Sequence, residues 1–166
     1  MGKIDWRNFF ELVGLVAIVL SLIFVGLQMR QDQILARSEL GAGTVEAFND
    51  LGLTATDPEF ARAFAKMLNE PDNLTDDEMI QINSYLIAAK SLFIRECYLV
   101  SRGVFSECTN FIKSNAGRFF GSRYAQSWWR LNWAPNPYLP DWVNDEVTGL
   151  GGDTNQQRLR ELRESL

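Results

Sequence analysis

No catalytic motif appears in this chain, and histidine is absent from all 166 residues. Without histidine the chain lacks the most frequent general base, the commonest metal ligand and any Ser–His or Cys–His nucleophile pair. A helical di-iron site of the Glu-x-x-His type is excluded for the same reason. We therefore expect no catalytic residue, no cofactor and no metal site.

The densest group of carboxylates superficially resembles a calcium loop. It consists of Asp72, Asp76, Asp77 and Glu78. An EF-hand loop needs a glycine at its sixth position and a glutamate at its twelfth, and neither is present. Thr75 and Glu78 instead have the spacing of a capping box, so this stretch predicts the start of a helix.

Two other stretches could carry chemistry but favour structural interpretations. Glu96 follows Arg95 in the most apolar soluble segment, and we expect this carboxylate to be ion-paired or exposed rather than a buried catalytic group. The sequence GLGGD at 149–153 lacks the Lys-Ser/Thr of a phosphate-binding loop and does not join a strand to a helix. It predicts a linker.

The element that must position the rest is the apolar stretch Phe9–Met29, which carries no charge from Leu12 onward. Twenty-one helical residues reach roughly 31 Å, the thickness of a bilayer core. We predict a transmembrane helix at 9–29, preceded by a tail at 1–8 with Trp6 at the interface. The stretch is longer than the apolar core of a signal peptide, and no small-x-small cleavage site follows it.

Three small residues share one face of this predicted span. Gly14, Ala17 and Ser21 are spaced at i, i+3 and i+7. Small residues on one face allow another helix to approach closely, so we predict a partner-helix face here. The alternative is that glycine and alanine are simply common in membrane spans.

The remainder predicts an all-α fold, with a helical domain of about five helices at 30–148. The apolar positions between Asp76 and Arg102 cover most of the circumference of one long helix, which should be packed on several sides at the centre of the domain. Gly41 and Gly43 weaken the helix that follows the span and predict a kink or a close contact. Residues 149–166 should form a flexible break and a short amphipathic helix.

Four of the five tryptophans fall in one region of the chain: Trp128, Trp129, Trp133 and Trp142. Tryptophan is favoured both in protein interfaces and at membrane surfaces. Core packing and a partner-facing surface both remain open for these rings.

The two cysteines, Cys97 and Cys108, flank a predicted turn at Arg102-Gly103. Packed helices lie about 8–10 Å apart, whereas a disulfide needs Cα atoms within about 7 Å. A bridge is feasible only where the helices converge near the turn. We expect two free, largely buried thiols.

The junction SLIFVGLQMRQ, the later Asp-Pro-Glu-Phe-Ala and the Trp-Trp pair resemble an uncharacterised family of bacterial single-span membrane proteins. Members of that family often read SLIYVGLQIRQ at this junction. The resemblance implies an N-terminal anchor in the bacterial inner membrane and a helical domain, and no enzymatic activity. Its members are basic just after the span, which favours a cytoplasmic domain. Here Lys3 and Arg7 before the span balance Arg30 and Arg37 after it.

The overall charge also limits the classes of molecule that the chain is expected to bind. A formal charge of −5 argues against nucleic acid, which requires a basic surface. We expect a non-catalytic accessory or scaffolding subunit of a larger membrane complex, such as a respiratory or photosynthetic one, in contact with the lipid bilayer and other membrane protein subunits. The alternative is a membrane-anchored sensory or ligand-binding module, which would need a polar-lined pocket between its helices. A hydrolase or transferase is disfavoured because no nucleophile motif is present.

Overall fold

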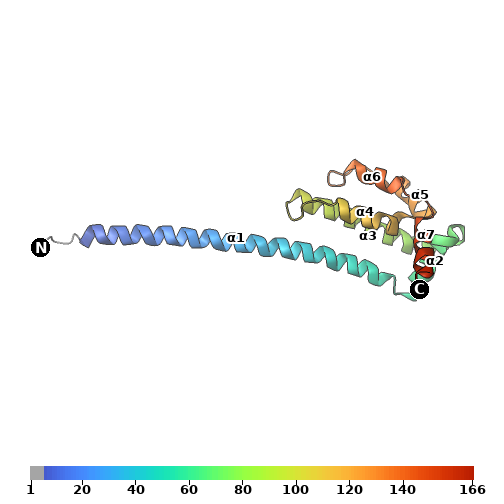
Figure 1. Ribbon diagram of the computed structural model, residues 1–166, viewed down its shortest axis with the longest axis horizontal. Coiled ribbons are helices and arrows are strands. Elements are labelled where there is room, and N and C mark those ends of the chain that lie inside the picture. Colours follow the sequence, from blue (N-terminus) through green and yellow to red (C-terminus); the bar gives the residue numbers. More distant parts are fainter. Residues whose placement is uncertain (1–5) are drawn as a thin grey trace. The chain divides into compact units, whose positions relative to one another are not determined.

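The computed structural model describes residues 6–166, with side chains from Phe10 onward. This part of the chain is all-α and contains no strand, so the predicted fold class is confirmed (Figure 1). Its elements are α1 (Trp6–Thr54), α2 (Pro58–Asn69), the short 3-10 helix η1 (Pro71–Asn73), α3 (Asp76–Ser101), α4 (Thr109–Phe120), α5 (Arg123–Asn132), α6 (Asp141–Thr148) and α7 (Thr154–Glu164).

The chain divides into two compact units, Met1–Glu39 and Leu40–Leu166, and α1 runs through the boundary. In the first unit, the large apolar side chains from Phe10 to Met29 are 48–67% exposed. The most apolar 18 residues of α1 have a mean hydropathy of 2.6, and no other helix in the described chain is long and apolar enough to cross a membrane. Of the predicted tail, residues 1–5 lie outside the described part, and Trp6 already belongs to α1.

Two helices of the second unit begin where the sequence predicts. The Asp57 carboxylate accepts hydrogen bonds from the backbone N–H groups of Glu59 and Phe60, both at 2.9 Å, and Pro58 opens α2. At the start of α3, Thr75 and Glu78 form the predicted capping box. These caps satisfy amide groups that no helical carbonyl can reach, which fixes where each helix starts.

The turn after α3 depends on one glycine. Gly103 has a φ of +68°, a left-handed conformation that costs glycine little. The backbone N–H of Val104 donates to the Leu99 carbonyl at 2.9 Å and closes the helix end. The chain then runs irregularly to Thr109, three residues beyond the helix start predicted at Ser106.

The core of the second unit forms around α3, as predicted. Ile82, Leu86 and Phe93 are fully buried, and the Phe93 ring packs edge-to-face on Phe119 and Phe120 at 6.1 and 5.6 Å. Such aromatic contacts add specificity to the area that they bury. One part of the prediction is wrong. Ile80 and Ile87, two of the apolar positions expected to be packed, are 63% and 49% exposed.

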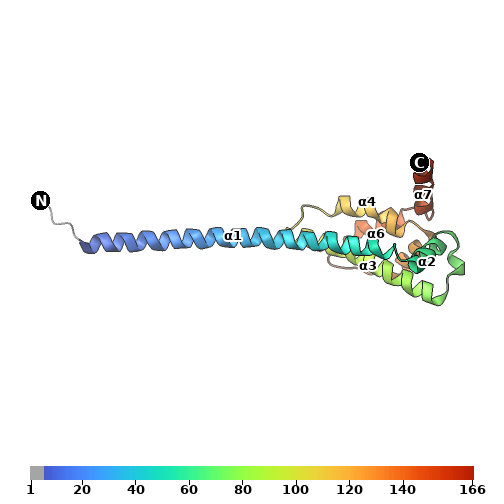
Figure 2. The same cartoon turned by 90° about the horizontal axis from the view of Figure 1, so that it is seen from below.

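The first turn of the C-terminal helix α7 packs on α2 and α4, and the rest of α7 projects beyond them (Figure 2). Its first residue, Thr154, lies against Gly117 of α4 and against Gly121, which directly follows that helix; added Cβ atoms there would approach it to 3.2 and 2.9 Å. The backbone N–H of Asn155 donates to the Gly121 carbonyl at 3.0 Å. The side chain of Gln156 also donates to the Leu68 carbonyl of α2. The glycine pair therefore lets α7 dock closely.

Candidate functional site

The predicted partner-helix face lies on α1 in the first unit. Gly14, Ala17 and Ser21 are all exposed there. No atom of the described chain, apart from the local helix backbone, lies within 4 Å of the point where a Cβ on Gly14 would be. Another helix therefore has room to approach this face, and the existence of that helix remains a prediction.

A groove in the second unit lies between the C-terminal part of α1 and the exposed side of α3. It consists of two adjoining hollows of about 460 and 220 Å³. Leu51 of α1 and Ala88 of α3 line both hollows, so the two form one elongated depression. We call this depression the α1–α3 groove.

The α3 wall of the groove has a regular surface. Ser84, Ala88 and Ser91 occur at i, i+4 and i+7 and therefore share one helical face. Ile80 and Ile87 lie on the same face and present their exposed side chains beside these small residues. A row of small residues flanked by apolar ones fits the ridge of an incoming helix.

The glycines of α1 that predicted a kink or a close contact mark a close contact. A Cβ on Gly43 would come within 2.7 Å of the Arg95 guanidinium, which lines one end of the α1–α3 groove. Gly41 lies close to the Phe105 ring, at 3.5 Å by the same measure. The α-helix continues through both positions, and these neighbours are the end of a flexible side chain at Gly43 and a ring at ordinary van der Waals distance at Gly41.

The tryptophans separate into buried and half-buried rings. Trp128 and Trp129 are buried, and their indole N–H groups donate to Asn83 at 2.5 Å and Asn144 at 3.1 Å. Trp133 is half-buried and stacks on Trp129 with ring centroids 5.5 Å apart. Two of the four predicted interface aromatics are thus core residues with satisfied polar groups.

Lys90 completes this aromatic region. Its ammonium lies 5.7 and 5.8 Å from the ring centroids of Trp129 and Trp133 and donates to the Asn132 carbonyl at 2.6 Å. Partial burial lowers the pKa of Lys90. The rings already bind a cation of their own chain. Trp142 is half-buried at the edge of a separate hollow.

The expectation of two free thiols is wrong. Cys97 and Cys108 form a disulfide, with their Cα atoms 5.1 Å apart. The expectation assumed that Cys108 lies on the helix facing α3 at the usual interhelical distance. Cys108 is instead the residue before α4, in the irregular segment after Gly103, where the backbone can come closer. Both cysteines are buried, as expected.

The expectation for Glu96 is also wrong. Its side chain is buried, makes no ion pair within the described part of the chain, and leaves its Oε2 atom without a hydrogen-bond partner. Burial raises the pKa of the Glu96 carboxyl, and nearby Arg95 opposes that rise only in part. A carboxyl in this setting favours its protonated form. No nucleophile or metal ligand accompanies it among the described contacts.

Three residues of the acidic cluster lie in the first turn of α3, where Glu78 takes part in the capping box. The Lys66 ammonium donates to both carboxylate oxygens of Glu78, at 2.7 and 2.9 Å. This hydrogen bond, followed by that of the Thr75 backbone N–H, lowers the pKa of Glu78. Asp76 and Asp77 occupy the first turn of α3, where negative charge is favourable. No group of three potential metal ligands occurs in the described chain.

No family model, curated protein or solved structure matches this chain. The fold defines the class of protein by itself, namely an all-α protein with one N-terminal helix that is long and apolar enough to span a membrane. Sequence reasoning missed the α1–α3 groove as a site. The available signal was that Ile80 and Ile87 share a face with Ser84 and Ser91, an apolar pair within the polar side of the helix.

Proposed function

We propose that this protein is a non-catalytic accessory subunit of a larger complex in the bacterial inner membrane, anchored by residues 9–29 of α1. The observation that carries the proposal is the α1–α3 groove, which Ile80 lines and which Ile87 adjoins on the same face of α3, both with exposed side chains. Exposed apolar side chains around a groove are typical of a surface that another protein covers. The exposed small-residue face of α1 supports the same function.

The proposed occupant of the groove is a helix of a partner subunit. The α3 wall carries only small side chains over two helical turns, at Ser84, Ala88 and Ser91. A surface of this shape suits a helix better than a loop. Arg95 lines one end of the groove and Asp57 the other. A partner helix with an acidic end beside Arg95 and a basic end beside Asp57 would complement both charges.

The same proposal places the helical domain on the oxidising, periplasmic side of the membrane. Disulfides persist in the periplasm and are rare in the cytoplasm, so the Cys97–Cys108 bridge supports this side. The family resemblance favours the cytoplasmic side, and the basic residues flanking the span are balanced. Thiol labelling of the denatured chain from intact cells, with and without reductant, tests the orientation. Two labelled thiols without reductant would contradict it.

The subunit proposal is tested by filling the groove in the full chain. Ser84→Trp should reduce co-purification of a partner subunit from native detergent at least tenfold, because the indole occupies the wall where the helix packs. Ser101→Trp, on the same helix but outside the groove, should leave co-purification unchanged. Mass spectrometry of the co-purified proteins gives the measurement. Equal recovery of the same subunit with both variants would refute the groove as its docking site.

The small-residue face of α1 has its own test. Gly14→Ile and Ser21→Ile add bulk where a neighbouring backbone would approach. Each should weaken association with the partner while insertion into the membrane stays intact. Unchanged association in both variants would mean that the partner contacts only the helical domain.

A further inference from the structure

Another cavity, of about 280 Å³, lies between α7 and side chains of α2, α3 and α4. Apolar side chains form most of its surface, among them Phe64 and Leu68 of α2 and Leu159 and Leu162 of α7. Small-molecule sites typically begin near about 300 Å³, so the cavity suits a small ligand.

The charged groups of the cavity are both cationic. Arg118 of α4 and Arg158 of α7 both line it, and no carboxylate does. Neither guanidinium forms an ion pair within the described chain. Arg118 stacks over Phe48 and Phe119, with its central carbon 5.5 and 6.0 Å from the ring centroids. Stacking uses the face of a guanidinium and leaves the donors at its edge available.

A second observation is independent of these charges. Asn155, which also lines the cavity, is only 7% exposed, and its Nδ2 atom has no hydrogen-bond partner. Leaving a buried amide donor unpaired costs about 1–3 kcal/mol, and such groups are rare in native structures. An acceptor that enters the cavity would offset this cost.

From this combination we propose that the cavity binds an aliphatic carboxylate, with its tail among Leu68, Leu159 and Leu162 and its head at Arg118 and Arg158. Arginine binds carboxylates through paired hydrogen bonds, and a single acyl chain suits the small apolar interior better than a two-chain lipid. The cavity shares Tyr85 with the α1–α3 groove, but its two arginines and Asn155 lie outside that groove, so this inference goes beyond the proposed subunit function.

The direct test is photo-crosslinking of the full chain in phosphatidylcholine nanodiscs with decanoate that carries a terminal diazirine. Digestion and mass spectrometry should find the label on the cavity residues of α2 or α7. Labelling of the span at 12–29, where the probe reaches the protein from the lipid, serves as the internal reference. Unlabelled decanoate should compete at the cavity at least tenfold better than decanol, which has the same tail without the charge.

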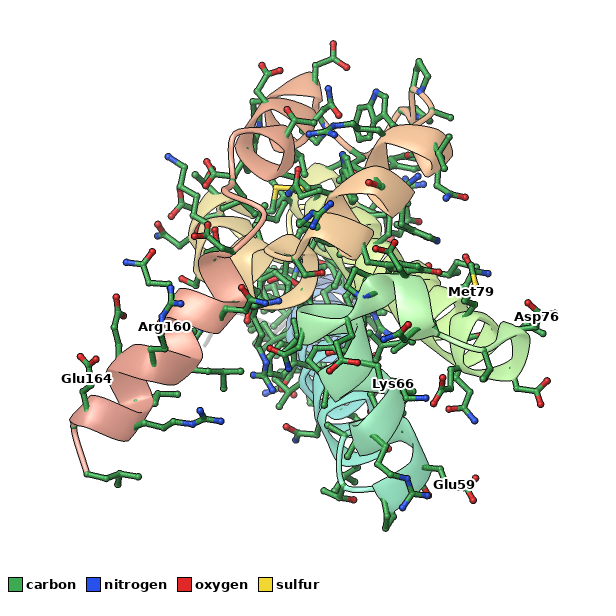
Figure 3. All side chains as sticks on the ribbon, turned by 90° about the vertical axis from the view of Figure 1, so that its right-hand side faces the viewer. Glu59, Lys66, Asp76, Met79, Arg160 and Glu164 are labelled. Carbon is green, nitrogen blue, oxygen red and sulfur yellow. A yellow bond between two sulfur atoms is a disulfide. The ribbon has the colours of Figure 1, made fainter. Side chains whose placement is uncertain are left out.

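Matched charge variants separate the site from general electrostatics. Arg118→Gln with Arg158→Gln should reduce cavity labelling at least tenfold relative to the span. The control pair, Arg130→Gln with Arg160→Gln, removes equal charge from residues that do not line the cavity; Figure 3 labels Arg160 on α7, together with Lys66 on α2. Leu159→Trp should also block labelling by filling the cavity without changing charge. Circular dichroism checks that each variant is folded.

Several results would overturn the proposal. Equal cavity labelling in the two double variants would show that the cavity does not recognise a carboxylate. Equal competition by decanol and decanoate would show the same. Label confined to the span would show that the cavity stays unoccupied. In nanodiscs that contain phosphatidylglycerol, cavity labelling should persist. Its loss there would assign the cavity to an anionic lipid headgroup instead of a free carboxylate.

Discussion

The apolar part of α1 and the helix α3 both carry many large apolar side chains. Those of α1 are exposed, whereas many of those of α3 are buried. From Leu12 to Met29, α1 has no charged residue, and its large apolar side chains are exposed to the same degree on all sides. In α3, Ile82, Leu86 and Phe93 are fully buried by the helices of the second unit. The length of the charge-free run, 18 residues from Leu12 to Met29 against 11 from Met79 to Ala89, separates the helix that is long and apolar enough to span a bilayer from the helix that builds a core.

The largest expected effect concerns the apolar part of α1. Leu20→Arg with Ile23→Arg places two charges near the middle of the apolar stretch, at about 2.5–3.5 kcal/mol each on insertion scales, or about 5–7 kcal/mol together. We expect the chain to leave the membrane pellet after alkaline carbonate washing. The matched control, Ile80→Arg with Ile87→Arg on the exposed side of α3, should stay in the pellet. A wild-type chain released by carbonate would refute the anchor itself.

The second prediction tests the other half of the comparison, the core around α3. Phe93→Ala removes a fully buried ring that packs on Phe111, Phe119 and Phe120, and should lower the free energy of unfolding of the helical domain by about 3–5 kcal/mol. Chemical denaturation of the full chain in detergent, followed by near-ultraviolet circular dichroism, measures the change. Carbonate extraction should be unaffected. A stability loss under 1 kcal/mol would mean that α3 is not the centre of the core.

The third prediction concerns a covalent constraint that only the second unit has. Reduction of Cys97–Cys108, or Cys97→Ala with Cys108→Ala, opens a loop with a sequence separation of 11 and should lower the free energy of unfolding by about 2–4 kcal/mol. Wild-type protein without reductant provides the reference. If reductant changes neither the unfolding curve nor the number of reactive thiols, the bridge is not formed in solution.

The smallest expected effect depends on pH. Burial raises the pKa of Glu96 in the folded state, so the folded domain favours the protonated carboxyl. The resulting stability is complete below the pKa of the unfolded chain, about 4.3, and is lost as pH rises through the higher folded value. Glu96→Gln should therefore gain stability over wild type as pH increases from 4.5 to 8. The exposed control Glu46→Gln should show no such trend. A constant difference across this range would contradict the assignment.

Much of the fold follows from local sequence signals. The apolar stretch, Asp57-Pro58 and the Thr75–Glu78 capping box predict where α1, α2 and α3 lie, because each signal acts within a few residues. The long α3 also forms the predicted centre of the core. These are cases in which local preference and tertiary packing agree.

The features that sequence could not predict depend on neighbours distant in the chain. Ile80 and Ile87 have the spacing of core residues, and only the arrangement of the other helices leaves them exposed. The disulfide depends on α4 starting at Thr109, although no side chain caps that helix and Ser106-Glu107 is the stronger local start signal. The cavity beside α7 requires residues from four separate helices and has no sequence motif at all.

The disulfide also determines how the domain would respond to a protease. Arg102 lies in the exposed turn between Cys97 and Cys108, so a trypsin-like enzyme in the same compartment can reach the bond before Gly103. A cut there would divide the chain into residues 1–102 and 103–166, yet the bridge would hold the two fragments together. The nicked protein would run as one band on a non-reducing gel and as two after reduction. The anchor would thus keep its hold on the C-terminal fragment even after the backbone is severed.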